Sequence, residues 1–325
     1  MADKPRWEVP LAQQPRPEEL DFDLARTLRA VVSLTAEIPE TAFTASILGT
    51  ERSGSGVLIS DDGLVLTIGY LVTEAENVWL KTASGRRVPA HPVAIDGEHG
   101  FGLVQAMGDL DAEPIKFGSS RLADVGEPVI VAGGGGLAQA VRARIVAKQE
   151  FAGYWEYYLD EALFTAPAHP LWGGAALIGP DGKLLGIGSL HVQHSSGRGE
   201  SEDINMIVPI DLLGPVLPDL RKYGRINRPA RPWLGVYSTE NDGRVVVADV
   251  SEEGPAGMAG LRSGDIIASV RDRAVDSLAD FYREVWACGP AGTEVPVEIV
   301  RDKRNLWLRI KSADRASFLR KPRMN

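Results

Sequence analysis

The chain has 325 residues, of which 44% are hydrophobic and 24% are charged. At ~150 residues per domain, this length and composition predict a globular protein of two or three domains. The 44 acidic residues outnumber the 35 basic ones, and a net charge of −9 argues against a non-specific nucleic-acid binder, which needs a basic stripe facing the phosphates. The single cysteine, Cys288, excludes an intramolecular disulfide and a cysteine-rich metal site.

The expected compartment follows from the apolar runs of the sequence. The first twenty residues contain no apolar stretch of the kind that a secretory signal carries. The longest apolar stretch, residues 63–72, is far shorter than the ~20 residues of a membrane-spanning helix, and acidic residues flank it. We therefore expect a protein without a membrane span that stays in the cytoplasm.

The N-terminal part carries two predicted elements. Residues 1–18 are polar and proline-rich, which is typical of a loose arm. Residues 19–34 space Leu20, Leu24 and Leu28 as a stripe on one face of a helix. We expect this helix to pass into a strand.

Short β-type runs follow from about residue 42 to residue 192. Turn signals such as Asp61-Asp62-Gly63 separate them. Many short strands with regular turns predict a sandwich or a barrel. The turn-rich residues 109–124 are expected to join two β-rich halves.

The remaining residues predict a second, smaller unit. Residues 210–224 indicate a terminal helix that prolines interrupt, and residues 225–232 form a basic, proline-containing linker. From Trp233 to about Ser312 the patterns indicate two strands, a short helix, a strand, a longer helix and two more strands. The longer helix is amphipathic, with its apolar face formed by Leu278, Phe281, Tyr282 and Val285.

Several motifs resemble those of a known family. Residues 54–67, GSGVLISDDGLVLT, resemble the opening strands of the HtrA/Deg group of trypsin-like serine proteases. Gly173-Gly174 followed by residues 181–188 resembles the segment that carries and follows the nucleophile of that group. The second unit resembles the PDZ domain that follows the protease, in the segments WLGV (233–236), GPAGMAGL (254–261) and GDII (264–267).

The resemblance spans about residues 30–312 and implies a mainly β chain. Its expected architecture is a trypsin-like double antiparallel β-barrel followed by an α+β PDZ domain. The implied organisation is an arm and helix over 1–40, the double barrel over 41–220, a linker over 221–232, the PDZ domain over 233–312 and a basic tail over 313–325.

The three positions of the family's catalytic triad carry unsuitable residues. The resemblance places Tyr70 where the family has its histidine, and a phenol with a pKa of ~10 is a poor base at neutral pH. Gly100 stands at the aspartate position and has no side chain. Trp172 stands at the serine position, and its indole offers no nucleophilic oxygen. Pro170 stands where a glycine N–H would contribute to the oxyanion hole.

A shifted alignment does not restore the triad. The first histidine of the chain is His91, which lies beyond the strand that would have to carry the base. No Ser, Thr or Cys occurs between Ala166 and Gly186. We therefore expect no catalytic residues, and a catalytically inactive HtrA-like homologue with a scaffold, chaperone-like or regulatory role. Two alternatives stay open: an active HtrA-type serine endopeptidase of protein quality control, and a structural subunit that mixes with an active paralogue.

The PDZ-like unit keeps its means of binding peptides. PDZ domains add an extended peptide beside one strand, and a backbone loop holds its C-terminal carboxylate. By resemblance, Trp233, Leu234, Gly235 and Val236 form that loop and edge strand, while Leu278, Tyr282 and Val285 line the groove. The expected partners are peptides or protein C-termini. The alternative is a groove filled by the protein's own tail or by another subunit, and the resemblance implies a possible homo-oligomer, a trimer.

Other candidate sites are weighed in the same way. The glycine run 133–136 lacks the Gly-Lys-Ser/Thr of a phosphate loop and is interpreted as a turn. His99 and His169, with Tyr70, could ligate a metal, but no third histidine is evident, so we expect neither a metal nor a cofactor.

Two further segments stand out. Six aromatic residues lie in residues 151–164, which could bind a partner, cover the end of the second barrel or fill the space of a substrate. A bulky Trp172 fits the last of these. The C-terminal residues Arg315, Arg320, Lys321 and Arg323 predict a solvated, disordered basic tail.

Overall fold

The computed structural model describes residues 7–195 and 201–320. They divide into two compact units, and each is described by itself. The first unit contains the described residues up to Gln149 and those from Glu161 to Asn227. The second contains residues 150–160 and 228–320, so a short segment from the middle of the sequence packs with the C-terminal unit.

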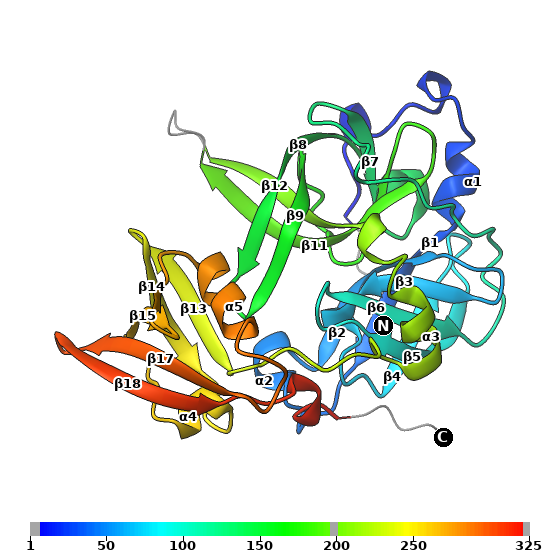
Figure 1. The fold of residues 1–325 in the computed structure, drawn as a ribbon. Coiled ribbons are helices and arrows are strands. Elements are labelled where there is room, and N and C mark those ends of the chain that lie inside the picture. Colours follow the sequence, from blue (N-terminus) through cyan, green and yellow to red (C-terminus); the bar gives the residue numbers. More distant parts are fainter. Residues whose placement is uncertain (1–6, 196–200, 321–325) are drawn as a thin grey trace. The chain divides into compact units, whose positions relative to one another are not determined.

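The first barrel is a closed antiparallel sheet of six strands in the order β1-β2-β3-β6-β5-β4 (Figure 1). Buried and exposed residues alternate along β4 and β5, as expected for strands with one face toward a core and the other toward solvent. The strands are β1 (Val31–Glu37), β2 (Glu51–Leu58), β3 (Leu64–Ile68), β4 (Asn77–Lys81), β5 (Arg87–Ile95) and β6 (Phe101–Ala106).

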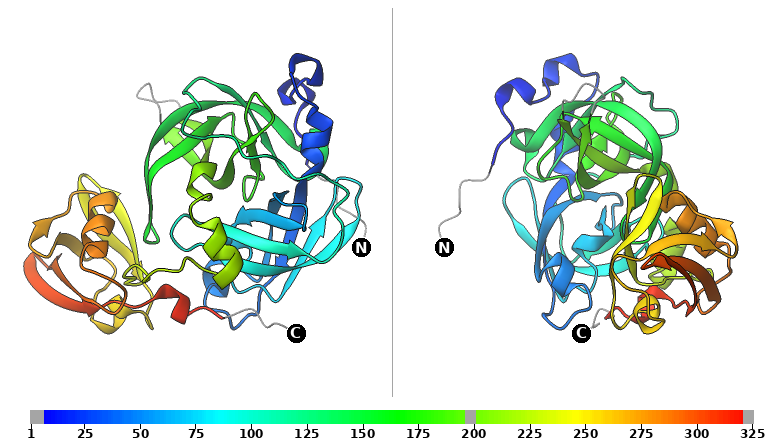
Figure 2. Two further views of the ribbon diagram at one scale, coloured as in Figure 1. Left: turned by 45° about the vertical axis from the view of Figure 1, so that its right-hand side comes forward. Right: turned by 90° about the vertical axis from the view of Figure 1, so that its left-hand side faces the viewer.

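The second barrel has the same construction, with its six strands in the order β10-β11-β12-β9-β8-β7. Its core is made of fully buried aliphatic residues, among them Ile145, Leu163 and Ile207. In both views of Figure 2 the blue-to-cyan strands and the green strands form two separate barrels. The strands are β7 (Pro128–Ala132), β8 (Ala140–Gly153), β9 (Tyr157–Ala166), β10 (Ala176–Ile178), β11 (Leu184–Ser195) and β12 (Ser201–Pro209).

The helices of the first unit are short. Helix α1 (Leu24–Arg29) begins after Asp23, whose side chain accepts a hydrogen bond from the Arg26 N–H as an N-cap, and it leads directly into β1. The first barrel therefore begins at Val31, inside the segment 1–40 that the sequence analysis gave to an arm and helix. Helix α2 is Ala45–Leu48, and the predicted helix after Pro209 is split into a 3₁₀ turn, Ile210–Leu212, and α3 (Leu217–Tyr223).

The second unit is an antiparallel sheet in the order β13-β14-β15-β17-β18, with β16 paired to β15. Helix α4 (Pro255–Met258) and helix α5 (Leu278–Trp286) accompany it. The apolar face of α5, with Phe281, Tyr282 and Val285, is buried in the core of this unit. The strands are β13 (Val236–Asn241), β14 (Arg244–Val250), β15 (Ile266–Val270), β16 (Arg273–Ala274), β17 (Glu294–Arg301) and β18 (Arg304–Lys311).

The start of the expected basic tail is ordered, which corrects the prediction of a disordered segment. Trp233 and Ala313 exchange two main-chain hydrogen bonds of 3.0 Å, and the ring of Phe318 lies 4.9 Å from that of Trp233. Arg315 lies in a 3₁₀ turn, Arg315–Ser317. Lys321 and Arg323 lie outside the described residues.

Two closed antiparallel barrels followed by an α+β unit confirm the expected fold class. In the described part of the chain, no helix has both the length and the apolar character needed to cross a membrane.

Candidate functional site

Tyr70 lies in a 3₁₀ turn, Gly69–Leu71, that directly follows β3. Arg52 fixes this turn, because one of its Nη atoms donates to the carbonyls of Tyr70 at 2.6 Å and Thr73 at 3.1 Å. The Tyr70 hydroxyl donates to the carbonyl of Ser189 at 2.9 Å. Burial raises the pKa of this phenol well above its usual range, although a hydrogen bond with the Trp172 side chain partly offsets it. The group is a neutral hydrogen-bond donor at physiological pH.

Gly100 lies immediately before β6 and has a φ of +89°, a left-handed conformation that favours glycine. Its carbonyl accepts a hydrogen bond of 2.7 Å from the N–H of Gly69. The neighbouring carboxylate, Asp96, is buried and lies 2.7 Å from Nδ1 of His99. Asp96 thus orients His99, and the position at Gly100 itself supplies only main-chain groups.

Trp172 is half-buried, and its ring centroid lies 5.3 Å from that of His191. The next residue, Gly173, accepts a 2.8 Å hydrogen bond from the Ser55 N–H, and a Cβ placed on it would come within 2.8 Å of the Tyr70 hydroxyl. The fold therefore brings Tyr70 against the segment of Trp172, and brings Gly100 against the turn that carries Tyr70. Pro170, two residues before Trp172, offers no N–H.

His169 is completely buried, and main-chain groups hold both ring nitrogens. The Leu171 N–H donates to Nδ1 at 3.0 Å, which leaves Nε2 to donate to the Gln139 carbonyl, also at 3.0 Å. Asn205 fixes the main chain of His169 through two further hydrogen bonds of 2.6 and 3.2 Å. Sequence reasoning did not single out Asn205 because its role depends on a contact across 36 residues. His99 and His169 thus have different partners, and within residues 7–195 and 201–320 no group of three or more His, Cys, Asp or Glu side chains is arranged to hold a metal.

The four residues of the expected carboxylate loop, Trp233 to Val236, are buried in the second unit. Gly235 has a φ of +78°, which turns successive N–H groups toward one point. The N–H groups of Leu234, Gly235 and Val236 all donate to the carboxylate of Glu156. Leu278, Tyr282 and Val285 lie on α5 and are buried in the same core cluster.

Glu156 belongs to the aromatic segment 151–164, and sequence reasoning did not identify its role. The structure packs residues 150–160 into the second unit, which corrects the expectation that this segment covers a barrel end or fills its cleft. The N–H groups of residues 234–236 donate to Glu156 of the β8–β9 hairpin, whereas the protein's own tail contacts the loop at Trp233. In the sequence, Glu156 is a single glutamate within an aromatic turn, and this local pattern does not indicate which residues it contacts.

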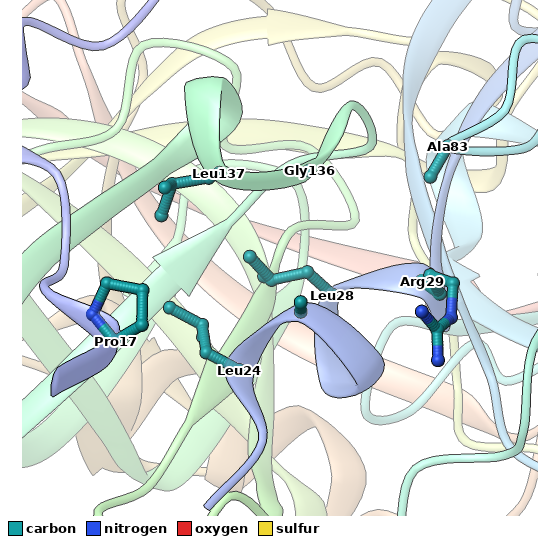
Figure 3. A pocket seen from close by; sticks show the side chains of 8 residues that line it. Pro17, Leu24, Leu28, Arg29, Ala83, Gly136 and Leu137 are labelled. Atoms are coloured by element: carbon teal, nitrogen blue, oxygen red, sulfur yellow. The ribbon is translucent and has the colours of Figure 1, made fainter.

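An apolar cavity of about 150 Å³ lies in the first unit, beside α1 (Figure 3). Its side chains are mainly aliphatic and come from three separate segments of the sequence. None of the residues expected to act in catalysis or peptide binding lines it. Those that do are Pro17, Leu24, Ala25, Leu28, Arg29, Ala83, Gly136 and Leu137.

Family models match both units: a trypsin-like peptidase domain over residues 54–187 and a PDZ domain over residues 232–311. A probable periplasmic serine endoprotease, DegP-like, of Pseudomonas fulva is 30% identical over 271 residues. Both units of the chain are similar to the HtrA-type serine proteases. The serine protease Do-like HtrA of Bacillus subtilis is 24% identical over 323 residues and is matched over 89% of this chain and 71% of its own length.

The solved structures of HtrA-type proteases have the same fold. A serine endoprotease from Yersinia pestis matches with a TM-score of 0.52 at 26% identity, covering 89% of this chain and 95% of that one. The HtrA-type protease AlgW with tripeptide matches with the same TM-score of 0.52 at 21% identity, covering 92% and 97%. The chain spans about half the length of the DegP-like relatives; the Pseudomonas fulva match covers 79% of this chain and 55% of that protein.

These names bear on two of the expectations from sequence. The expected cytoplasmic location is wrong, because the DegP-like relatives are named periplasmic proteins. The relatives are also named serine endoproteases, which backs the alternative of an active endopeptidase better than the inactive one.

Proposed function

We propose that this HtrA-type chain is inactive as a peptidase and binds peptides or protein C-termini through its PDZ domain. The observation that carries the proposal is the triplet Tyr70, Gly100 and Trp172 at the positions where the family has its catalytic residues. The names of the relatives support a periplasmic location for this function.

The chemistry of these residues supports inactivity. A phenol whose pKa is raised by burial keeps its proton at neutral pH and cannot act as the general base. Glycine cannot fix an imidazole tautomer, and an indole cannot attack a carbonyl carbon. Loss of the triad reduces turnover on the order of 10⁶-fold, and Pro170 also removes an oxyanion donor.

The geometry of the second unit supports peptide binding. Three successive N–H groups, from Leu234 to Val236, converge on one carboxylate, as a PDZ loop does on a peptide's C-terminus. Among the described strands β13 pairs with β14 alone, and along its other edge the Ser238 N–H donates to the Tyr154 carbonyl, a contact that an added peptide strand would replace. AlgW, a structural relative, was solved with tripeptide and decapeptide.

An active endopeptidase of protein quality control is the second candidate, and the names of the relatives favour it. It requires a nucleophile and a base other than the residues at positions 70 and 172. A structural subunit that assembles with an active paralogue, in a trimer as the family resemblance implies, is the remaining candidate.

Incubation of the purified full chain with unfolded casein and a fluorophosphonate serine probe separates the candidates. We expect no cleavage and no labelling, while the Bacillus subtilis relative in parallel reports a working assay. Cleavage that the probe abolishes would overturn the inactive reading. Co-purification of a second chain carrying an intact triad would favour the mixed assembly. Panning the full chain against peptides with free C-termini tests the binding function, which fails if no sequence is enriched over a bead control.

A further inference from the structure

We propose that the peptide groove of the PDZ domain is occupied in cis by the turn of residues 153–156, with the Glu156 side chain in the place of a peptide's C-terminal carboxylate. An external ligand then binds only by displacing this turn. The inference rests on the proposed function, because it names the internal competitor of the same groove.

The carboxylate of Glu156 makes the contacts that define a carboxylate-binding loop. One oxygen accepts hydrogen bonds from the N–H groups of Gly235 at 2.6 Å and Val236 at 2.9 Å. The other accepts from the N–H of Leu234 at 3.0 Å. Glu156 is partly exposed as a whole residue, but its carboxylate is enclosed, so these hydrogen bonds are formed away from water. No N–H of the three is left for a second carboxylate in this arrangement.

The main chain of the turn also takes the place of an added strand. The Ser238 N–H on β13 donates to the Tyr154 carbonyl at 2.9 Å, which is the type of hydrogen bond that an added peptide strand makes. From the opposite wall, the Tyr282 hydroxyl on α5 donates to the Gly153 carbonyl at 2.6 Å. Both walls of the groove are therefore bonded to the turn.

Backbone geometry explains how an internal residue can present a carboxylate in this way. Glu156 has a φ of +59°, so the chain reverses at the residue that enters the loop. The Glu156 N–H donates a hydrogen bond of 3.3 Å to the Tyr282 hydroxyl oxygen. A chain end needs no such reversal, whereas an internal segment can enter the loop only through a side chain at a turn.

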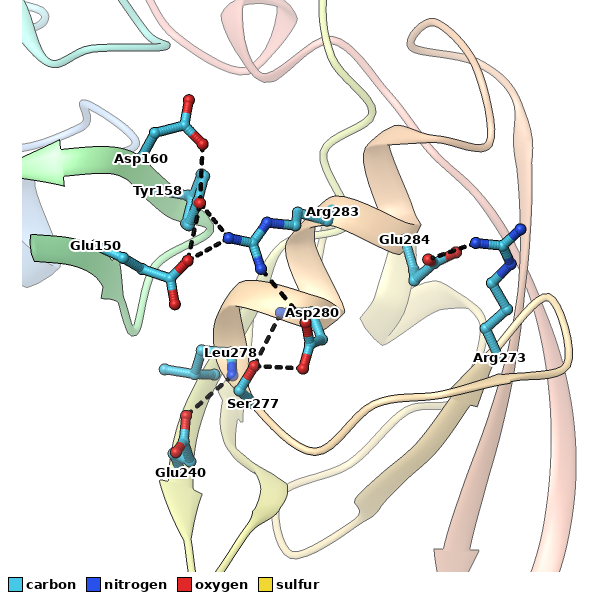
Figure 4. Close-up of polar contacts among 10 residues, drawn as sticks. All are labelled: Glu150, Tyr158, Asp160, Glu240, Arg273, Ser277, Leu278, Asp280, Arg283 and Glu284. Atoms are coloured by element: carbon cyan, nitrogen blue, oxygen red, sulfur yellow. Dashed lines mark hydrogen bonds and ion pairs between the residues drawn. The ribbon is translucent and has the colours of Figure 1, made fainter.

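Side chains on both sides of the turn extend the contact (Figure 4). Tyr158 is 8% exposed and belongs to the same apolar core as Leu278 and Tyr282. The guanidinium of Arg283 lies 4.8 Å above the Tyr158 ring and also bonds to its hydroxyl and to Glu150. In Figure 4 the side chain of Arg283 extends from α5 toward the hairpin, with dashed contacts to Tyr158 and Glu150 and to Asp280 on its own helix. The docked segment thus reaches beyond the turn along the helix.

The internal occupant indicates the class of the external ligand. The loop accepts a carboxylate, the edge of β13 accepts an extended main chain, and the adjoining Tyr237 ring lies 6.2 Å from that of Tyr154. The matching partner is an extended peptide that ends in a free carboxylate and carries an aromatic residue close to it. The docked turn competes with this peptide, so the apparent affinity of the domain for the peptide falls as the docked turn becomes more populated.

The test compares the full chain with Glu156→Ala and with a matched control, Glu161→Ala, which removes an exposed glutamate of the same hairpin. The first measurement is hydrogen exchange of the amides of residues 234–236. The second is fluorescence anisotropy with a fluorescein-labelled pool of heptapeptides that have free C-termini. Thermal unfolding checks that each variant is folded, and Glu156→Gln replaces the alanine variant if it is not.

We expect Glu156→Ala to lose protection at residues 234–236 and to bind the pool at least tenfold more tightly than the wild type, with Glu161→Ala unchanged. Saturating peptide should also raise exchange in residues 150–160 of the wild type. Equal affinity and equal exchange in all three forms would overturn the cis occupation while the peptide-binding function stands. Exchange that rises without peptide binding to any form would instead overturn the binding function, and with it the displacement step.

Discussion

The hydroxyl of Tyr70, in the turn that follows β3, donates a hydrogen bond to the main-chain carbonyl of Ser189, 2.9 Å away. The contact joins residues that are 119 positions apart and lies beside Gly173. The hydrogen bond therefore ties the turn after β3 to β11 and stabilises the fold at this point.

Tyr70→Phe should lower the free energy of unfolding by about 1–2 kcal/mol, because it removes the donor and leaves the Ser189 carbonyl without this partner. Urea unfolding measures the change. Tyr223→Phe is the matched control, since Tyr223 is 46% exposed and should change the stability by no more than about 0.5 kcal/mol. Equal effects of the two substitutions would show that the Tyr70 hydrogen bond adds nothing to stability.

Replacing Trp172 by serine, alone or together with Tyr70→His, should leave casein uncleaved. Position 100 would still lack a carboxylate, Asp96 would still be bonded to His99, and Pro170 would still lack an N–H. The measurement is release of labelled fragments over hours, with the Bacillus subtilis relative as the active reference. Turnover by the double variant would mean that Asp96 can leave His99 and orient the new imidazole.

Peptide binding should strengthen as the pH rises from 5.5 to 8. Burial raises the pKa of Glu156 from 4.5 to about 7, although the hydrogen bonds from the loop and the charge of Arg315 act to lower it. The docked turn therefore holds a proton that the free turn releases, and docking weakens between pH 4.5 and about 7 as that proton is lost. Across this range the competing turn should weaken on the order of tenfold or more, and the peptide pool should bind correspondingly better.

The groups that face the Glu156 carboxylate are the N–H groups of the loop, Arg315 from the 3₁₀ turn after β18, Tyr282 from α5 and Tyr237 from β13. Both tyrosines have raised pKa values and stay neutral over the range, so Glu156 is the group that titrates. Glu156→Gln should flatten the pH dependence. If the peptide affinities of the variant and the wild type changed equally with pH, a group other than Glu156 would be responsible for the pH dependence.

Asp265→Ala should destabilise the second unit by about 3 kcal/mol. The Asp265 carboxylate is 1% exposed, accepts hydrogen bonds of 2.6 and 2.7 Å from Arg301, and also holds the Arg262 N–H at 2.8 Å. Arg301 is partly exposed, but removing the buried carboxylate takes away the charged partner of its guanidinium and the acceptor of the Arg262 N–H. Glu294→Ala is the control, because its ion pair with Arg309 is exposed and is worth less than about 1 kcal/mol. Hydrogen exchange of the amides in residues 233–312 as a function of urea concentration measures the stability of the second unit in both variants. Similar losses of stability in the two variants would contradict the prediction.

Most of the fold could be predicted from the sequence because its strands carry local signals. Alternating burial in β4 and β5 and the glycine-containing turns between strands are patterns within a few residues. The start of the first barrel was harder, since Val31 and Val32 continue the leucine stripe of α1 although they lie in β1. The family motifs located positions 70, 100 and 172 by their spacing, and the structure brings those segments together.

The groove could be predicted only in part. The loop and α5 have their own motifs, but the occupant is separated from the loop by about eighty residues, as in the Glu156–Val236 hydrogen bond. Nothing in the order of amino acids says which of two compact units a hairpin tip joins. The ordered residues after Ala313 are a similar case, because they are held by Trp233 rather than by a pattern of their own.

The assignment of residues 150–160 to the second unit has a practical consequence for dissecting this protein. A gene fragment that starts at residue 228 would encode a PDZ domain without the segment that covers part of its apolar core. Such a fragment should aggregate more readily and have a lower free energy of unfolding than the same domain in the full chain. Conversely, proteolytic cleavage near residue 228 would break the chain between residue 227 and the rest of the PDZ domain. The cleaved domain should still bind residues 150–160 and therefore elute together with the N-terminal fragment in size-exclusion chromatography.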